Sequence, residues 1–133
     1  MDSSRLERVY TITEWYDGAR TGVANYQGQP HYYECLSWED SPQSADTYAL
    51  TPLDGDTFQL ALEDWDIWLR WQAAFQVGTT TEATHPALPE DQERQVVLRL
   101  LLRERLRTQQ GLHHMAKGTF HYDRDTTVEW QPV

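Results

Sequence analysis

The spacing of apolar and polar residues changes along the chain from a strand-like period of two to a helical period and back again. From Val9 to Tyr16 almost every residue is β-branched or aromatic, which is the composition that strands favour. Asp17 and Gly18 follow as a turn signal. Similar short runs recur, and the first three of them predict a meander. The four strands expected in this half are residues 9–16, 21–26, 31–38 and 48–53.

The third of these strands is partly apolar on both faces. Because successive side chains point to opposite sides of a strand, Tyr32, Leu36 and Trp38 share one face, and Tyr33 and Cys35 share the other. A sheet with two apolar faces is either covered on both sides or curled into a small barrel. We therefore expect a sheet without a clean solvent face.

The middle of the chain carries the helical signal, beyond a polar loop at residues 39–47. Apolar residues recur at steps of three and four, and Asp56 is a suitable N-cap, so a helix is predicted over residues 58–75. The alternative is a strand over residues 58–62 followed by a helix that begins at Asp64.

A second helix is predicted over residues 89–109, because Pro89 suits a first helical turn and Gly111 lies just beyond the end. Its apolar residues are Val96, Val97, Leu98, Leu100, Leu101, Leu102 and Leu106. A surface this wide means either that the helix is deeply buried or that it also meets another chain. The second alternative makes another copy of this chain, bound through residues 89–109, a candidate partner.

The chain ends on a hairpin pattern, which sets the expected fold class. Apolar and polar residues alternate over 119–122 and 127–130, on either side of a turn at 123–126. Strands so patterned would pair with the N-terminal meander, which makes the two helices an insertion. The sequence predicts one α+β domain over residues 1–133, with an antiparallel, barrel-like curled sheet packed against two inserted α-helices.

Charge narrows the choice of partners. The 133 residues include 11 Lys and Arg and 21 Asp and Glu, giving a formal net charge of −10 at pH 7. The acidity is concentrated in residues 1–60, and it would repel nucleic-acid phosphates and anionic membranes. A basic protein is a more compatible partner. The sequence has no run of 18 apolar residues and no signal-peptide pattern, so we expect a cytoplasmic protein.

The sequence contains none of the motifs that bind nucleotides, zinc or calcium, or that form a nucleophile elbow. Cys35 is the only cysteine, which excludes an intramolecular disulfide. Nothing beside it in the sequence would lower the pKa of its thiol. A metal site would need His113, His114 and His121 to meet, and no ligand spacing supports this. We expect no metal and no cofactor.

An acid–base pair is the remaining enzymatic hypothesis. On the predicted helix, Asp64 lies among aromatic side chains that would raise the pKa of its carboxyl group. Glu34, His31 or His85 could stand opposite it, as in the general acid–base catalysis of a small hydrolase or isomerase. The alternative is that Asp64 forms a structural ion pair with Arg20 or with an arginine of the second helix.

Trp71 is the candidate recognition anchor. It lies near Ile67 and Ala74, about 60° round the predicted helix from Trp68 at about 100° per residue. An exposed tryptophan beside an acid is typical of an interface hot spot, but core packing is the default in a small domain, where six tryptophans must mostly go inside. The partner-binding candidates are therefore Trp71, Ile67 and Asp64.

Residues 16–31 look like a family signature, and the chain resembles small bacterial proteins, but the resemblance names no family and supplies no site residue. An acidic chain with candidate aromatic anchors and no catalytic motif favours a non-enzymatic binding or regulatory protein of the inhibitor, immunity-factor or adaptor type. The small hydrolase or isomerase is the alternative.

Overall fold

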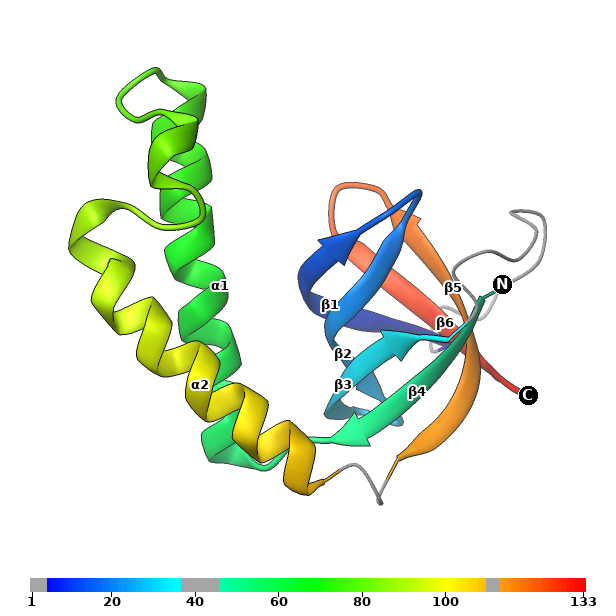
Figure 1. The fold of residues 1–133 in the computed structure, drawn as a ribbon. Helices are drawn as coiled ribbons and strands as arrows, with labels where there is room; N and C mark the ends of the chain where they lie inside the picture. Colours follow the sequence, from blue (N-terminus) through cyan, green and yellow to red (C-terminus); the bar gives the residue numbers. More distant parts are fainter. Residues whose placement is uncertain (1–4, 37–45, 110–112) are drawn as a thin grey trace. The chain divides into compact units, whose positions relative to one another are not determined.

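Six antiparallel strands close into a barrel in the computed structural model, which describes residues 5–36, 46–109 and 113–133 (Figure 1). The strands are β1 (Leu6–Trp15), β2 (Ala19–Tyr26), β3 (Gln29–Cys35), β4 (Asp46–Pro52), β5 (His114–Tyr122) and β6 (Thr126–Pro132). Each strand pairs with the next, and β6 closes the barrel by pairing Thr127–Glu129 with Leu6–Arg8 of β1. The predicted antiparallel, barrel-like sheet is confirmed.

The first strand, β1, is bent and pairs with both β2 and β6. Its register with β2 shifts between Val9 and Thr11, between Ile12 and Glu14, and again before Trp15. Such irregularities bend and twist a strand, which a small closed barrel requires. The N-terminal end of β1 therefore pairs with β6, and the rest pairs with β2.

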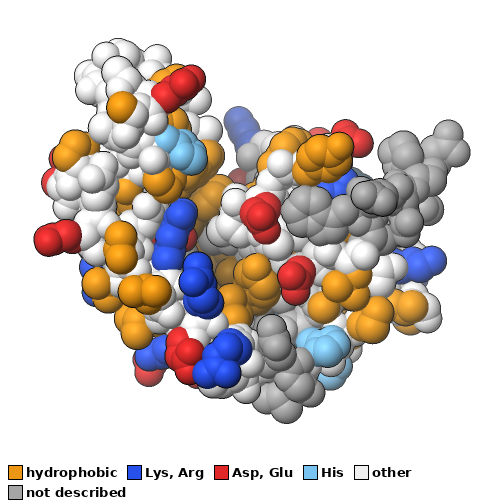
Figure 2. Space-filling view, in the orientation of Figure 1, with side chains coloured by type: hydrophobic (Ala, Val, Ile, Leu, Met, Phe, Trp, Pro, Cys, Tyr) orange, Lys and Arg blue, Asp and Glu red, His pale blue; other side chains and the backbone are white. Residues whose placement is uncertain are grey.

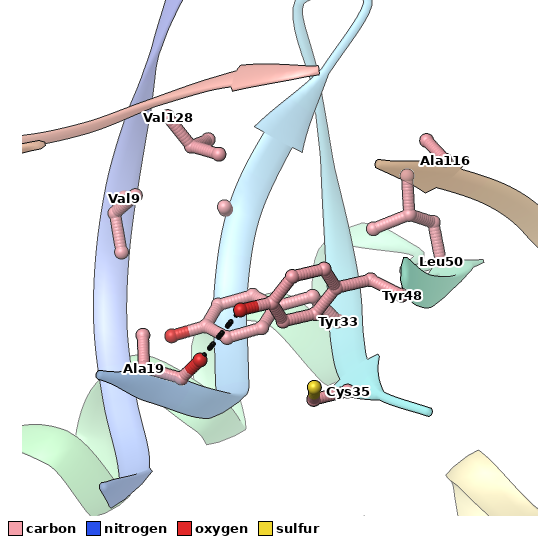
Figure 3. Packing of buried hydrophobic residues seen from close by; sticks show 9 residues of the cluster. Val9, Ala19, Tyr33, Cys35, Tyr48, Leu50, Ala116 and Val128 are labelled. Carbon is pink, nitrogen blue, oxygen red and sulfur yellow. Dashed lines mark hydrogen bonds between the residues drawn. The ribbon is translucent and has the colours of Figure 1, made fainter. Parts of the chain in front are cut away.

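Two tyrosines cross the barrel interior. Tyr33 of β3 and Tyr48 of β4 are buried with their ring centroids 5.8 Å apart (Figure 3). The Tyr33 hydroxyl donates to the carbonyl oxygen of Thr11 at 2.9 Å, and the Tyr48 hydroxyl donates to that of Ala19 at 2.7 Å. Burial raises the pKa of both hydroxyls, so both remain protonated donors. The side chains packed around them include Val9, Ala24, Cys35, Leu50, Ala116 and Val128.

Two α-helices are inserted between β4 and β5 and form a second unit, residues 55–108. The elements of this helical hairpin are α1 (Gly55–Gln76), η2 (Glu82–Thr84), η3 (Pro89–Asp91) and α2 (Gln92–Thr108). Its buried apolar cluster consists of Ile67, Ala87 and Leu98, with Leu60 packed against them. Because the chain divides into a barrel unit and a hairpin unit, the single domain stays a prediction.

Ion pairs tie α1 to the second half of the hairpin. They join Arg70 to Asp91 at 3.0 Å, Arg94 to Glu63 at 2.6 Å and Arg99 to Asp64 at 3.4 Å. Each pair has an exposed arginine, so solvent screens it and its contribution to stability is small.

The helix predicted over 58–75 is confirmed, and the alternative strand over 58–62 is wrong, because α1 runs unbroken through those residues. A short 3₁₀ turn and α2 together fill residues 89–108. Trp38, most of the loop at 39–47 and Gly111 lie outside the described residues. Within the described ranges, no helix combines the length and the apolar character needed to cross a membrane.

Candidate functional site

Three aromatic residues reach the surface at one end of the barrel and are called the aromatic corner below: Trp15, Tyr16 and Tyr122. Trp15 is 59% exposed and Tyr16 is 64% exposed. The Trp15 ring meets the Tyr122 ring edge to face, with centroids 4.9 Å apart. Behind it, Phe120 stacks on Tyr122 and anchors the group to the barrel core. Exposed aromatic surface of this kind is typical of recognition sites.

The turn after β1 fixes the direction of these rings. Asp17 and Gly18 both have positive φ angles, 53° and 124°, and the Tyr16 N–H donates to the Gly18 carbonyl at 3.0 Å. Aspartate and glycine tolerate such backbone angles better than other residues. The Asp17–Gly18 pair recognised in the sequence therefore makes a tight turn that leaves Trp15 and Tyr16 at the surface.

The buried Arg20 stabilises this turn by hydrogen bonds to its backbone. The Arg20 guanidinium donates to the carbonyl oxygens of Tyr16 and Asp17, and to the Asp46 carboxylate at 2.7 Å. Burial opposes its charge, but the Cys35 thiol and Asp46 outweigh that effect, so the pKa of Arg20 is raised. A charge of this kind is stable in the interior only because its donors are paired.

The same guanidinium also lies beside the only cysteine, where the sequence showed no neighbouring positive charge. Arg20 Nη1 lies 3.4 Å from Cys35 Sγ, so a positive group does adjoin the thiol. The sequence missed it because the two residues lie on β2 and β3 and meet only in the folded barrel.

Both backbone groups of Ala19 are bonded to tyrosine hydroxyls. The Ala19 N–H donates to Tyr122 Oη at 2.7 Å, while its carbonyl accepts from Tyr48, as the dashed line in Figure 3 marks. Burial raises the pKa of Tyr122, which keeps its hydroxyl neutral. The two bonds fix the start of β2 to β4 and β5, so the aromatic corner is preorganised.

Acidic residues adjoin the aromatic corner in the sequence. Glu14 and Asp17 flank it in β1 and the following turn, and Asp123 and Asp125 follow Tyr122, with Arg124 as the intervening cation. All four carboxylates are exposed, and in the described ranges none of them makes an ion pair. Exposed rings with such carboxylates next to them in the sequence suit a positively charged ligand, because each ring face attracts cations.

The four acid–base candidates do not form a pair within either unit. In the barrel, His31 and Glu34 are both on β3 but face opposite sides, with His31 buried and Glu34 exposed. In the hairpin, Asp64 pairs with Arg99, whereas His85 packs edge-on against Trp71 at 4.7 Å, two helical turns along α1. The expected ion pair of Asp64 with an arginine of the second helix is confirmed.

Trp71 and Ile67 lie inside the hairpin, which confirms the default of core packing for Trp71 and contradicts the hypothesis of an exposed anchor near Ile67. Trp71 is 7% exposed, stacks on Phe75, and donates from Nε1 to Thr84 Oγ1 at 2.9 Å. Helical periodicity gave its position round α1 correctly, but the segment between the helices covers that face. Asp64 is also buried, beneath Arg99.

The pattern of the sequence did not single out Trp15 and Tyr16 as candidate site residues. They were assigned to a strand, where aromatic residues are common. Their position in the sequence could have identified them. Two large aromatic residues directly before an Asp–Gly turn lie at the end of a strand, away from the residues that form the barrel core. That position distinguishes them from the tryptophans of α1.

The histidines of the C-terminal part do not meet. His114 and His121 stand at opposite ends of β5, and His113 precedes the strand. Seven residues of strand span about 23 Å, too far for one metal ion. Among the described residues, no group of three or more His, Cys, Asp or Glu side chains could hold a metal ion.

His31 gives a prediction for the pH dependence of stability. Burial lowers its pKa below 6.5, against the opposing effect of the hydrogen bond with the Gln29 carbonyl oxygen. The unfolded chain then binds the proton more readily, so the contribution of His31 is lost as the pH falls through 6.5. We expect His31→Gln to flatten the fall in unfolding free energy on acidification, measured by urea titration at each pH. The same substitution at exposed His113 is the control, and an equal flattening there would contradict the assignment.

No family model, no curated protein and no solved structure matches this chain.

Proposed function

We propose that this chain is a non-enzymatic binding or regulatory protein, of the inhibitor, immunity-factor or adaptor type, which engages a basic segment of another protein through the aromatic corner. The proposal is carried by one observation: two strongly exposed rings, Trp15 and Tyr16, adjoin exposed carboxylates in the sequence, at a turn whose carbonyl oxygens accept hydrogen bonds from Arg20. A rigid, exposed anchor loses little conformational entropy on binding.

The partner's chemistry follows from the surface. Guanidinium and ammonium groups bind over aromatic faces and beside carboxylates, so arginine or lysine side chains of the partner would occupy the aromatic corner. The net charge of −10 would attract such a segment from a distance and disfavour nucleic acid. We place this activity in the cytoplasm. The hydrolase or isomerase alternative lacks a supporting contact within either unit.

Trp15→Ala is expected to weaken binding of an arginine-containing peptide at least about tenfold, because a desolvated cation–π contact or aromatic anchor contributes about 1–2 kcal/mol or more. Calorimetric titration of the full chain with an Arg–Gly peptide measures this loss. Added salt should weaken the same binding, since the carboxylates are exposed.

Two controls sharpen this test. Leu100→Ala removes another exposed apolar side chain, on α2, and should leave binding unchanged. A peptide with glutamate in place of arginine should not bind. Equal losses for Trp15→Ala and Leu100→Ala, or no binding of the arginine peptide at all, would refute the proposal.

A further inference from the structure

The helix α2 has an apolar face that packs on nothing in its own unit. Arg94, Arg99 and Arg105 contact Glu63, Asp64 and Thr57 of α1, and Gln95 and Leu98 are buried between them. The opposite side of α2 carries four exposed apolar residues, called the α2 outer face: Val96, Val97, Leu100 and Leu101. Figure 2 shows hydrophobic side chains at the surface over this part of the hairpin, with charged side chains around them.

The four side chains expose more apolar area than a solvent-facing helix surface usually carries. Val96 is 60% exposed and Leu100 is 59% exposed. Steps of one, three and one residue place the four on adjacent turns of one side, opposite the buried stripe. A contiguous apolar patch of this kind marks an interaction site more often than a solvated surface.

Charges at the two ends of the α2 outer face identify the occupant. Glu93 precedes it and Arg103 follows it, and within the described residues neither side chain has an ion-pair partner. Their midpoint is residue 98, which lies within one residue of the middle of the apolar quartet, between Leu98 and Arg99. In an antiparallel pair of α2 helices, a two-fold axis at that point sets Glu93 of each copy level with Arg103 of the other.

Other charges on this side are compatible with the same arrangement. Glu104 lies one residue beyond the level of Glu93 in the other copy, but it is already paired with Arg107 at 2.6 Å. Antiparallel packing also opposes the two helix dipoles, with each acidic first turn beside a basic last turn. A parallel pair would instead set Glu93 beside Glu93 and Arg103 beside Arg103.

We propose that a second copy of this chain covers the α2 outer face, as an antiparallel, two-fold symmetric helix pair joined by Glu93 to Arg103 contacts at both ends. The interface is isologous, so each charge contact occurs twice. A single helix face is small compared with a standard interface, so the dimer is expected to dissociate on dilution. This dimer is independent of the aromatic corner.

Charge reversal tests the register as well as the association. Sedimentation equilibrium of the full chain over about a hundredfold range of concentration should reveal a reversible monomer–dimer equilibrium. Glu93→Arg should weaken the dimer at least about tenfold, because it creates two like-charge contacts. The double variant Glu93→Arg with Arg103→Glu should restore it, since the swapped charges pair again across the two-fold axis.

The controls separate this claim from general effects of charge. Glu34→Arg reverses an exposed acid on the barrel and should leave the dimer unchanged, as should Trp15→Ala. Helix content measured by circular dichroism identifies any variant that fails to fold. A chain that stays monomeric throughout, or a double variant no better than Glu93→Arg, would overturn the proposal.

Discussion

Replacing Arg20 with methionine is expected to lower the free energy of unfolding by about 3 kcal/mol or more. The substitution keeps most of the side-chain volume but removes every donor of the guanidinium. The Asp46 carboxylate then loses its ion pair with Arg20, and the carbonyl oxygens of Tyr16 and Asp17 lose the hydrogen bonds that Arg20 donates. Breaking a buried ion pair from one side costs about 3–5 kcal/mol, and the partial exposure of Asp46 places the loss near the lower end.

Two further arginine variants make this result specific. Arg20→Lys keeps the charge, but a single ammonium group cannot reach the three acceptors that the forked guanidinium reaches. The free energy of unfolding of Arg20→Lys should therefore lie between the values of the wild type and Arg20→Met. Arg8→Met removes an exposed arginine that lies over the Tyr10 ring, and it should cost less than about 1 kcal/mol. Urea titrations monitored by tryptophan fluorescence give all three values. Equal costs for Arg20→Met and Arg8→Met would mean that Arg20 does not organise the turn.

The substitution Gly22→Ala is expected to cost at least about 3 kcal/mol or to prevent folding. An added Cβ would stand 2.6 Å from Tyr33 Oη and would collide with the Thr11 carbonyl oxygen. The φ angle of 157° at this glycine is itself one that other residues rarely adopt. Overpacking costs about 1–3 kcal/mol, and the displaced Tyr33 to Thr11 hydrogen bond adds about 1 kcal/mol.

A second substitution tests the source of this loss. Tyr33→Phe removes the hydroxyl that the new methyl group would meet, so the Gly22→Ala and Tyr33→Phe costs should be less than additive in a double-mutant cycle. Gly55→Ala is the matched control, because nothing lies within 4 Å of the methyl group there. It should change stability by less than about 0.5 kcal/mol. Additive costs, or a Gly55→Ala cost as large as that of Gly22→Ala, would contradict this packing.

The sheet and the helices could be predicted because their signals are local. Alternation on β3 placed Tyr33 and Cys35 on one buried face, and three- and four-residue steps defined α1. Closure of the barrel could only be offered as one of two alternatives. It depends on Leu6–Arg8, a charged stretch before the first predicted strand, meeting Thr127–Glu129 more than a hundred positions away.

The candidate site was less predictable, since it depends on contacts between distant strands. Arg20 meets Cys35 and Asp46 only after three strands have paired, so no local pattern reveals the buried ion pair. Trp71 was in the expected place on its helix, but periodicity could not tell that Thr84 and His85 would cover it. The ring contact of Trp15 with Tyr122 likewise joins opposite ends of the sequence.

The proposed recognition role of the aromatic corner is tested most directly by following the indole N–H signals of the six tryptophans by NMR during titration with the arginine peptide. Trp15→Phe assigns the signal of Trp15. We predict that this signal and the backbone amides of Tyr16 and Gly18 shift first, while the indole signals of Trp71 and Trp130 stay in place. The absence of any shift, or shifts confined to the tryptophans of α1, would contradict the account.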